Sequence, residues 1–332
     1  MRGVEPTRCL RWMFTARLIL TVIGALAATR AFAQAPNDPR IAFYAVLDDD
    51  IRQPAIYTVT LDGLTLLQLT DGPGPHEHPS WSPDGRRIAF DARPDGSREI
   101  TVMDADGRNR QNLTNSLPND TFPAWSRDGE RIAFSSSAGR PAQADLYVMN
   151  ADGSGVAQLT DHPRDDTDPT WDRNGRRIAF SARRGVGPEG LPGWDLYVLD
   201  TRDGTETRLT DHPGVESQPD WSPTRDEILF HTYWEWETEI RTLDVSSGVL
   251  TALTDHPARD RNPAWSPDGR SVVWISERDG EDAIYVANRD GGNVRRVTAA
   301  LGRTWGPVWF DPSLGVDAIS NVFVTLGWLK RR

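Results

Sequence analysis

A pair of residues recurs six times in this 332-residue chain: a threonine, followed 11 residues later by a tryptophan. The pairs are Thr70 and Trp81, Thr114 and Trp125, Thr160 and Trp171, Thr210 and Trp221, Thr254 and Trp265, and Thr298 and Trp309. Four short segments of β type fall within each unit. A repeat of about 40 to 50 residues with four short strands is typical of a propeller blade. The sequence therefore predicts an all-β fold, a six-bladed β-propeller of four-stranded antiparallel blades.

Each repeat contains the signals of two tight hairpins. The first hairpin turns at a Ser-Pro-Asp-Gly sequence, as at residues 82–85, and the second turns at an Asp-Gly pair such as Asp152-Gly153. Proline presets φ at the second turn position, aspartate caps the turn backbone, and glycine accepts the left-handed conformation. The first two strands and the last two strands of each blade are therefore expected to pair locally.

All variation in repeat length falls in one loop. The distance from the second-strand aromatic to the third-strand position varies between 11 and 17 residues, whereas the other distances are constant. In a propeller this loop and the crossing between blades emerge on the same face. Variable loops on a rigid scaffold commonly carry binding, so we expect partners at that face.

The two ends of the repeat array complement each other. Gln34 stands where the first repeat should have its tryptophan, and the segment 306–310 supplies a first strand whose second-strand partner is missing. We therefore expect one blade shared by the N- and C-terminal segments, which closes the ring by sheet hydrogen bonding. The expected propeller spans residues 34–312, and residues 313–332 form a C-terminal tail with no assigned role.

Residues 1–33 have the pattern of a signal peptide. Basic residues precede an apolar run of 11 residues from Leu18 to Ala28, and Ala31-Phe32-Ala33 follows. This run is shorter than the roughly 20 residues of a membrane-spanning helix, so we expect cleavage near Ala33 and no membrane span afterwards. The mature protein is expected to be periplasmic or secreted. It would lack disulfides, because Cys9 is the chain's one cysteine.

The charge of the mature chain argues against nucleic acid as a partner. Removal of residues 1–33 deletes five Arg and one Glu, which leaves 32 basic against 47 acidic side chains and a formal charge of −15. A nucleic-acid-binding protein normally presents a basic face to the phosphates.

The repeated motifs resemble those of the TolB-type, WD-like propeller family. They are Leu-Thr-Asp-His-Pro, Pro-x-Trp-Ser-Pro-Asp-Gly-Arg-Arg-Ile-Ala-Phe, Ile-Tyr-Val and Asp-Gly, and the likeness extends from about residue 41 to 310. The resemblance implies a periplasmic propeller that binds protein partners of a cell-envelope complex. TolB has an α/β domain before its propeller, whereas here seven residues separate the expected cleavage site from Ile41. Peptidases with this propeller append a hydrolase domain, which we do not expect after Trp309.

Three histidines occupy one repeat position, directly after an aspartate: His162, His212 and His256. His76 and His78 lie in the corresponding first crossing. One interpretation is a local role in each turn. The other is a metal site, since propeller-fold polysaccharide lyases, which this chain also resembles, hold a metal ion with channel histidines. A metal-assisted polysaccharide lyase or hydrolase that uses the propeller channel is therefore the alternative function.

Six residues beyond the motif threonine, four of the six repeats carry an acidic side chain: Asp120, Asp166, Glu216 and Asp260. One interpretation is an acidic ring at the channel mouth, which would attract basic peptide segments or a divalent cation. The other is that each carboxylate caps its own crossing loop.

The variable loops contain three tryptophans besides those at the repeated position: Trp194 in the long loop of the fourth repeat, and Trp234 and Trp236 in the fifth. Exposed aromatic side chains beside acidic groups suit recognition of a peptide or a glycan. Alternatively, they pack the long loop against its neighbour.

The sequence contains no recognisable catalytic motif. We find no Ser-His-Asp or Cys-His arrangement and no glycine-rich phosphate loop, and we predict no bound cofactor. The predicted function is therefore an exported, non-enzymatic binding platform for protein or peptide partners in the cell envelope.

Overall fold

The structure is a computed structural model that describes residues 34–47, 53–94, 96–115, 118–140, 143–186, 192–235 and 237–314. The chain divides into two compact units, Met1–Phe32 and Ala33–Arg332, and the second contains all the described residues. The expected signal peptide, Trp236 and the tail beyond residue 314 lie outside the described residues.

Within the described residues, 24 strands form six antiparallel groups of four. The first three groups are β4 to β7 (His76–Trp81, Arg87–Ala92, Glu99–Asp104, Gln111–Asn112), β8 to β11 (Asp120–Trp125, Arg131–Arg140, Gln143–Asn150, Ala157–Gln158) and β12 to β15 (Asp166–Trp171, Arg177–Val186, Pro192–Asp200, Glu206–Arg208). The next two are β16 to β19 (Val215–Trp221, Glu227–Trp234, Glu237–Asp244, Leu250–Ala252) and β20 to β23 (Asp260–Trp265, Ser271–Ser276, Ala283–Asn288, Arg295–Arg296). The closing group is β24 (Arg303–Phe310), β1 (Arg40–Val46), β2 (Ala55–Thr60) and β3 (Leu66–Gln68).

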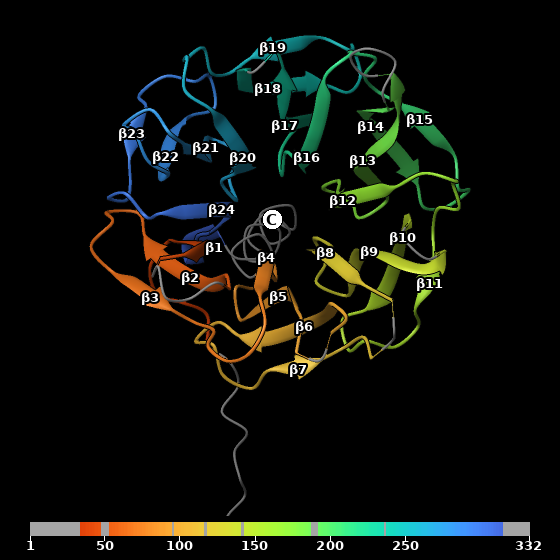
Figure 1. The fold of residues 1–332 in the computed structure, drawn as a ribbon, viewed down its shortest axis with the longest axis horizontal. Helices are drawn as coiled ribbons and strands as arrows, with labels where there is room; N and C mark the ends of the chain where they lie inside the picture. Colours follow the sequence, from red (N-terminus) through yellow and green to blue (C-terminus); the bar gives the residue numbers. More distant parts are fainter. Residues whose placement is uncertain are drawn as a thin grey trace, which may run out of the picture. The chain divides into compact units, whose positions relative to one another are not determined.

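The groups are arranged as blades around a common axis (Figure 1). The strands nearest the axis are β4, β8, β12, β16, β20 and β24. The propeller prediction is confirmed, and the six groups agree with the six expected blades. A short 3-10 helix, Pro312–Leu314, follows the last strand, and no described helix is long and apolar enough to cross a membrane.

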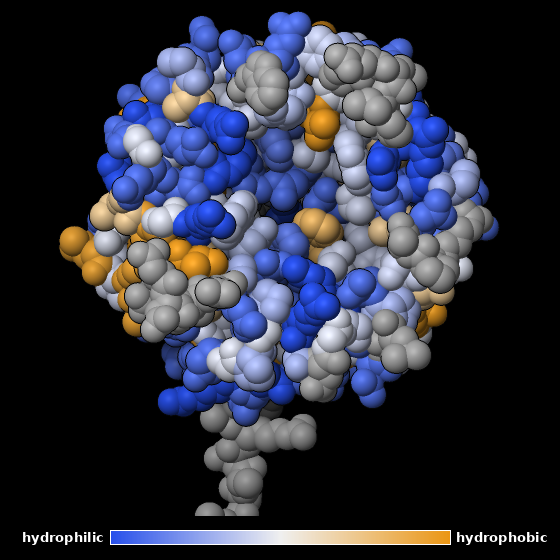
Figure 2. All heavy atoms as spheres, viewed as in Figure 1, coloured by the Kyte–Doolittle hydropathy of each residue, from blue (hydrophilic) through white to orange (hydrophobic). Residues whose placement is uncertain are grey.

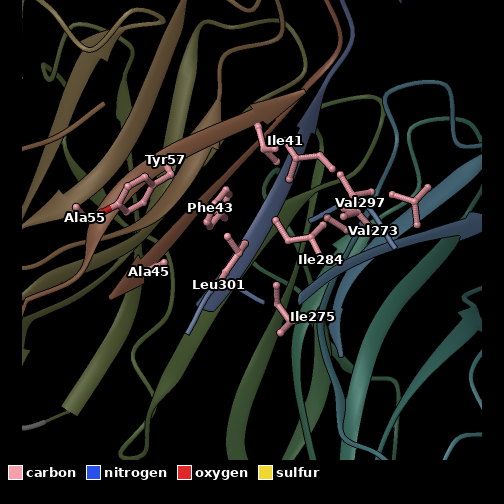
Figure 3. Packing of buried hydrophobic residues seen from close by; sticks show 13 residues of the cluster. Ile41, Phe43, Ala45, Ala55, Tyr57, Val273, Ile275, Ile284, Val297 and Leu301 are labelled. Atoms are coloured by element: carbon pink, nitrogen blue, oxygen red, sulfur yellow. The ribbon is translucent and has the colours of Figure 1, made fainter. Parts of the chain in front are cut away.

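The ring closes as predicted, because β1 lies between β2 and β24 in one sheet. Ile41 is paired with Trp309 on one side and with Val59 on the other. A cluster of buried apolar side chains joins this closing blade to the preceding one (Figure 3); it includes Phe43 and Ile275. Closure therefore combines strand pairing with burial of apolar surface.

The recurrent threonine joins the end of each outer strand to the third strand of its blade. Its hydroxyl oxygen accepts a hydrogen bond from a third-strand backbone N–H in all six repeats, at 2.7 to 3.0 Å. All six threonines are buried. A buried N–H without a partner is costly, which explains why this position needs a hydroxyl.

Replacement of Thr298 by valine is therefore expected to lower the free energy of unfolding by about 1 to 3 kcal/mol, because the N–H of Ile284 loses its acceptor. Thr298→Ser, the matched control, keeps the hydroxyl and should cost less. Urea unfolding followed by tryptophan fluorescence measures both. Equal losses in the two variants would contradict the role of the hydroxyl.

The recurrent tryptophan lies between neighbouring blades. The guanidinium carbon of Arg131 lies 4.5 Å from the ring centre of Trp171, and Arg177 lies 4.6 Å from Trp221. Each arginine belongs to the second strand of the preceding blade, so a cation–π contact links the two blades. A similar contact joins Arg87 to Trp125, whereas Arg289 lies over Trp265 within one blade.

The insertions lengthen the middle hairpins, as the spacing predicts. Strand β13 has 10 residues and β14 has 9, against 6 residues each in β5 and β6. A single parallel pair, Trp194 with Val215, joins the blade of β12 to β15 to the blade that begins with β16.

Candidate functional site

Each innermost strand is irregular at the same repeat position. In β4 the register shifts between Glu77 and Ser80, and equivalent shifts occur in β8, β12, β16 and β20. One residue in each strand has a left-handed backbone: His78 (φ 51°), Phe122 (53°), Asp168 (55°), Gln218 (54°), Asn262 (54°) and Gly306 (57°). We call these six residues the channel ring. Side chains other than glycine rarely adopt this conformation, and such strain is concentrated at functional sites.

The channel ring lines a cavity of about 230 Å³ at the centre of the propeller. Figure 2 shows a central hollow, bordered largely by hydrophilic side chains. The recurrent Thr and Trp are identical in every repeat, whereas the channel ring carries a different side chain in each. The residues that build the scaffold are thus the same in every repeat, whereas the residues that line the cavity differ from repeat to repeat. This contrast is expected of a surface shaped for a ligand.

An ion network lies behind one side of the channel ring. The buried carboxylate of Asp91, on β5, lies 2.6 Å from His78 Nδ1 through Oδ1 and 2.5 Å from Arg98 Nη1 through Oδ2. Arg98 also contacts Glu77. Two carboxylates thus alternate with two basic groups, which is the pairing that buried charges require.

Both ring nitrogens of His78 are engaged in hydrogen bonds. Nδ1 faces Asp91, and Nε2 lies 3.2 Å from the hydroxyl of Tyr44, which reaches in from β1. The rings of His78 and Phe122 are 3.9 Å apart, and Trp305 stacks on Tyr44 with centres 5.6 Å apart. These contacts fix the imidazole in one orientation.

The network shifts the pKa values of its members and of the facing carboxylate. Burial lowers the pKa of His78, but the charge and hydrogen bond of Asp91 oppose this and raise it overall. Burial raises the pKa of Tyr44 well above its ordinary value. Burial also raises the pKa of Asp168 to about 6, although the charge of His78 acts against it. His78 therefore favours its cationic form, and Tyr44 stays neutral.

One group of potential metal ligands occurs among the described residues. It consists of Glu77, His78 and Asp91, whose ligand atoms lie within 4.8 Å of one another. However, Arg98 contacts both carboxylates and both nitrogens of His78 are engaged. A metal ion would have to displace the guanidinium and deprotonate the histidine. The arrangement fits an internally neutralised ion network better than a metal centre.

The three repeated histidines each serve a local turn. Nδ1 of His162, His212 and His256 accepts a hydrogen bond from the backbone N–H two residues later, at 3.1 to 3.2 Å. None of the three belongs to the group of potential metal ligands in the described chain. The geometry thus agrees with the local interpretation of these residues.

The four repeated carboxylates are buried at the start of the innermost strands and do not line the cavity. The burial of Asp120, Asp166, Glu216 and Asp260 agrees better with the local interpretation of these carboxylates than with an acidic ring at the channel mouth. Asp166 and Glu216 receive hydrogen bonds from Thr160 and Thr210, and Asp260 pairs with Arg278. The left-handed residue two positions later turns toward the axis in their place.

The pKa values of Glu216 and Asp166 predict that the stability of the protein depends on pH. Burial raises the pKa of Glu216 from 4.5 to about 7, and that of Asp166 to about 6. The folded state then binds more protons than the unfolded state, so stability falls as pH rises from about 4.5 to 7.

Replacement of Glu216 by glutamine should remove part of this slope and stabilise the protein at pH 7 by about 1 to 3 kcal/mol, because the neutral amide carries no ionisation cost. Urea unfolding from pH 4.5 to 7.5 measures it, with the exposed-site variant Asp106→Asn as a control. A slope unchanged by Glu216→Gln would contradict the prediction.

The predicted aromatic residues lie away from the cavity. Trp194 is half-buried at the junction of two blades, where its backbone pairs with Val215. Trp234 is half-buried, and its ring meets His212 edge-on with centres 5.3 Å apart. Trp236 lies outside the described residues. The contacts of Trp194 agree with packing against the neighbouring blade, and recognition of a partner by these residues stays a prediction.

Sequence reasoning missed Tyr44, Asp91, Arg98 and most of the channel ring. One signal was available: Asp91 interrupts the buried strand Ile-Ala-Phe-Asp-Ala of β5, at a position where the next two repeats have serine. A carboxylate in such a strand requires a cationic partner, which points to a network. The six residues of the channel ring are of six different types, so no repeated residue in the sequence marks their position.

Comparison with known proteins agrees with this architecture. The sequence model of the family described as the TolB beta propeller domain matches residues 31–144 and 195–314. TolB from Acinetobacter baumannii superposes with a TM-score of 0.69 at 20% identity, over 83% of this chain and 68% of that one. A putative TolB from Agrobacterium tumefaciens gives 0.63 at 18%, over 82% and 98%.

An oligogalacturonate lyase in complex with manganese gives a TM-score of 0.51 at 15% identity, over 79% of this chain and 74% of that one. At these identities the likeness to solved structures concerns the fold alone. No curated protein matches the sequence.

Proposed function

Because the chain belongs to the TolB β-propeller domain family, we propose that it is an exported, non-enzymatic binding protein of the cell envelope. Its partner is a protein or peptide held at the channel mouth. The proposal rests on the contrast between the invariant Thr and Trp of the scaffold and the six different side chains of the channel ring. Export rests on the sequence of residues 1–33.

The polar groups of the channel support binding more than chemistry. His78 has both nitrogens engaged, so neither is free to move a proton to or from a substrate. Ser217 and His231 lie 3.1 Å apart, but His231 Nδ1 has no hydrogen-bond partner among the described residues, and burial lowers its pKa to about 4. A nucleophilic serine needs a base that is oriented by a third group.

A displayed library of random peptides, selected on the purified protein that begins at residue 34, tests the proposal. Selected peptides are then titrated against the channel variant Phe122→Ala and against Asp106→Asn, whose carboxylate is exposed in an outer turn. We expect Phe122→Ala to weaken binding at least about tenfold and Asp106→Asn to leave it unchanged. Peptides that bind both variants like the parent protein would place the partner site elsewhere.

A metal-assisted polysaccharide lyase remains the second candidate, favoured by the proximity of Glu77, His78 and Asp91. It predicts bound metal in the purified protein and cleavage of acidic oligosaccharides with an ultraviolet-absorbing unsaturated product. Elemental analysis and that absorbance assay separate the two functions. Stoichiometric metal together with turnover would replace the binding proposal.

A further inference from the structure

Asp168 is the carboxylate of the channel ring, and no cation contacts it directly among the described residues. Asp91 and Glu77 contact Arg98 and His78, whereas no ion pair among the described residues includes Asp168. Asp168 Oδ2 accepts a hydrogen bond from Thr167 at 3.0 Å, and His78 acts on it through space. Toward the cavity, Asp168 therefore presents a carboxylate that no cation contacts directly. Arg127 also lines the cavity, but the carboxylate of Asp220, in the same lining, acts against its positive charge.

A second acceptor lines the same cavity. Asn262 is 6% exposed, its Nδ2 donates to Gln218, and its Oδ1 has no hydrogen-bond partner among the described residues. An unpartnered buried acceptor costs free energy, which a donor on a ligand would recover. Phe122, on the blade next to that of Asp168, adds an aromatic face, which attracts cations.

The dimensions of the cavity limit the ligand. Its volume of about 230 Å³ is below the roughly 300 to 1,000 Å³ of most small-molecule sites. Gly306 contributes no side chain to the channel ring, and the ring of Tyr44 packs against it: a Cβ at this position would lie 2.8 Å from that ring. The cavity thus suits a single long side chain better than a chain of sugars.

We propose that the channel ring binds one cationic side chain of the partner, an arginine or a lysine, with its charge against Asp168, Asn262 Oδ1 and the ring of Phe122. This inference rests on the proposed function, because it names the part of a peptide partner that enters the channel. A carboxylate, an amide oxygen and an aromatic face together select positive charge and exclude negative charge.

Two synthetic probes that differ only in charge test the inference. Acetyl-Gly-Arg-Gly-amide and its citrulline counterpart have nearly the same shape, but citrulline is neutral. Each is titrated into the protein, and the indole N–H signals in NMR spectra report binding, since tryptophans line the cavity. We expect the arginine probe to bind at least about tenfold more tightly, and the difference to shrink with added salt.

Matched variants locate the effect. Asp168→Asn keeps the shape and tolerates the left-handed backbone, and it should abolish the preference for arginine. Asn262→Asp adds a charge at the second acceptor and should strengthen binding of the arginine probe. Asp106→Asn removes an exposed carboxylate in the turn between β6 and β7, outside the cavity lining, and should leave the affinities of both probes unchanged. Equal affinities of the two probes, or an arginine preference that survives in Asp168→Asn, would overturn the inference.

The two proposals can fail separately. If the selected peptides require Phe122 for binding but carry no basic residue, the protein binds peptides at the channel, and the inference of a cationic side chain is wrong. If peptide binding is insensitive to the channel variants, the proposed function itself is wrong.

Discussion

Replacement of Asp91 by asparagine is expected to lower the free energy of unfolding by about 3 to 5 kcal/mol. Asp91 is fully buried and contacts both His78 and Arg98. The variant keeps the shape of the side chain but leaves two basic groups facing a neutral amide. Loss of one partner of a buried ion pair is costly because the remaining charge stays away from water. Urea unfolding of the parent protein and the variant measures the difference.

The pH dependence of this loss tests its cause. Because the folded-state pKa of His78 is raised above 6.5, its stabilisation is complete below that pH and is lost as pH rises through the folded value. Without the negative charge of Asp91 this contribution should disappear, and the imidazole should titrate at lower pH in NMR spectra. Asp106→Asn controls for loss of charge alone. A loss below about 1 kcal/mol would show that water already screens the network.

Removal of β24 is expected to have the largest effect of all. A chain that ends at residue 302 lacks Trp309 and Phe310, and Phe310 packs on Trp81 with ring centres 5.2 Å apart. Loss of a large buried aromatic side chain typically costs about 3 to 5 kcal/mol, so two of them exhaust most of the roughly 5 to 15 kcal/mol that stabilises a domain. The shortened chain should therefore be largely unfolded, as judged by circular dichroism and tryptophan fluorescence.

Addition of the missing strand in trans should reverse the effect. A synthetic peptide of residues 300–314 supplies the hydrogen bonds that β1 receives from β24, and it should restore the folded signal in proportion to its concentration. A chain that ends at residue 314 keeps every described strand and serves as the control. A chain that ends at 302 and unfolds cooperatively with parental stability would show that the blades do not need closure.

The architecture could be predicted because its causes are local and repeated. The turn at residues 82–85 shows this: Asp84 accepts hydrogen bonds from the hydroxyl of Ser82 and the N–H of Arg86, and Gly85 has a φ of 66°. Thr70 likewise accepts a hydrogen bond from a third-strand N–H, and the equivalent bond recurs in each blade. Because such local requirements are the same in every blade, the same residue types recur at the same positions.

The site could not be predicted in the same way, because its parts come from different blades. Tyr44 meets His78 across 34 residues of sequence, and no spacing announces that contact. The position of the channel ring depends on a bulge whose residue differs in each strand. Without that bulge, Asp120 or Asp166 would be the natural candidates for the channel wall. A bulge changes which residues of a strand face each side, so a repeat position alone does not say which side chains face the channel.

The shared closing blade has a consequence for how the protein is made. Strand β1 receives its second neighbour only after roughly 260 further residues have been synthesised. At about 5 to 20 residues per second, this apolar strand waits on the order of ten seconds to a minute with one edge unpaired. Every nascent copy thus exposes an unpaired edge of β1 until β24 has been made. A copy truncated before residue 303 never covers that edge. The ring can close only after β24 has been synthesised, so an uncovered edge of β1 distinguishes an unfinished copy from a closed one.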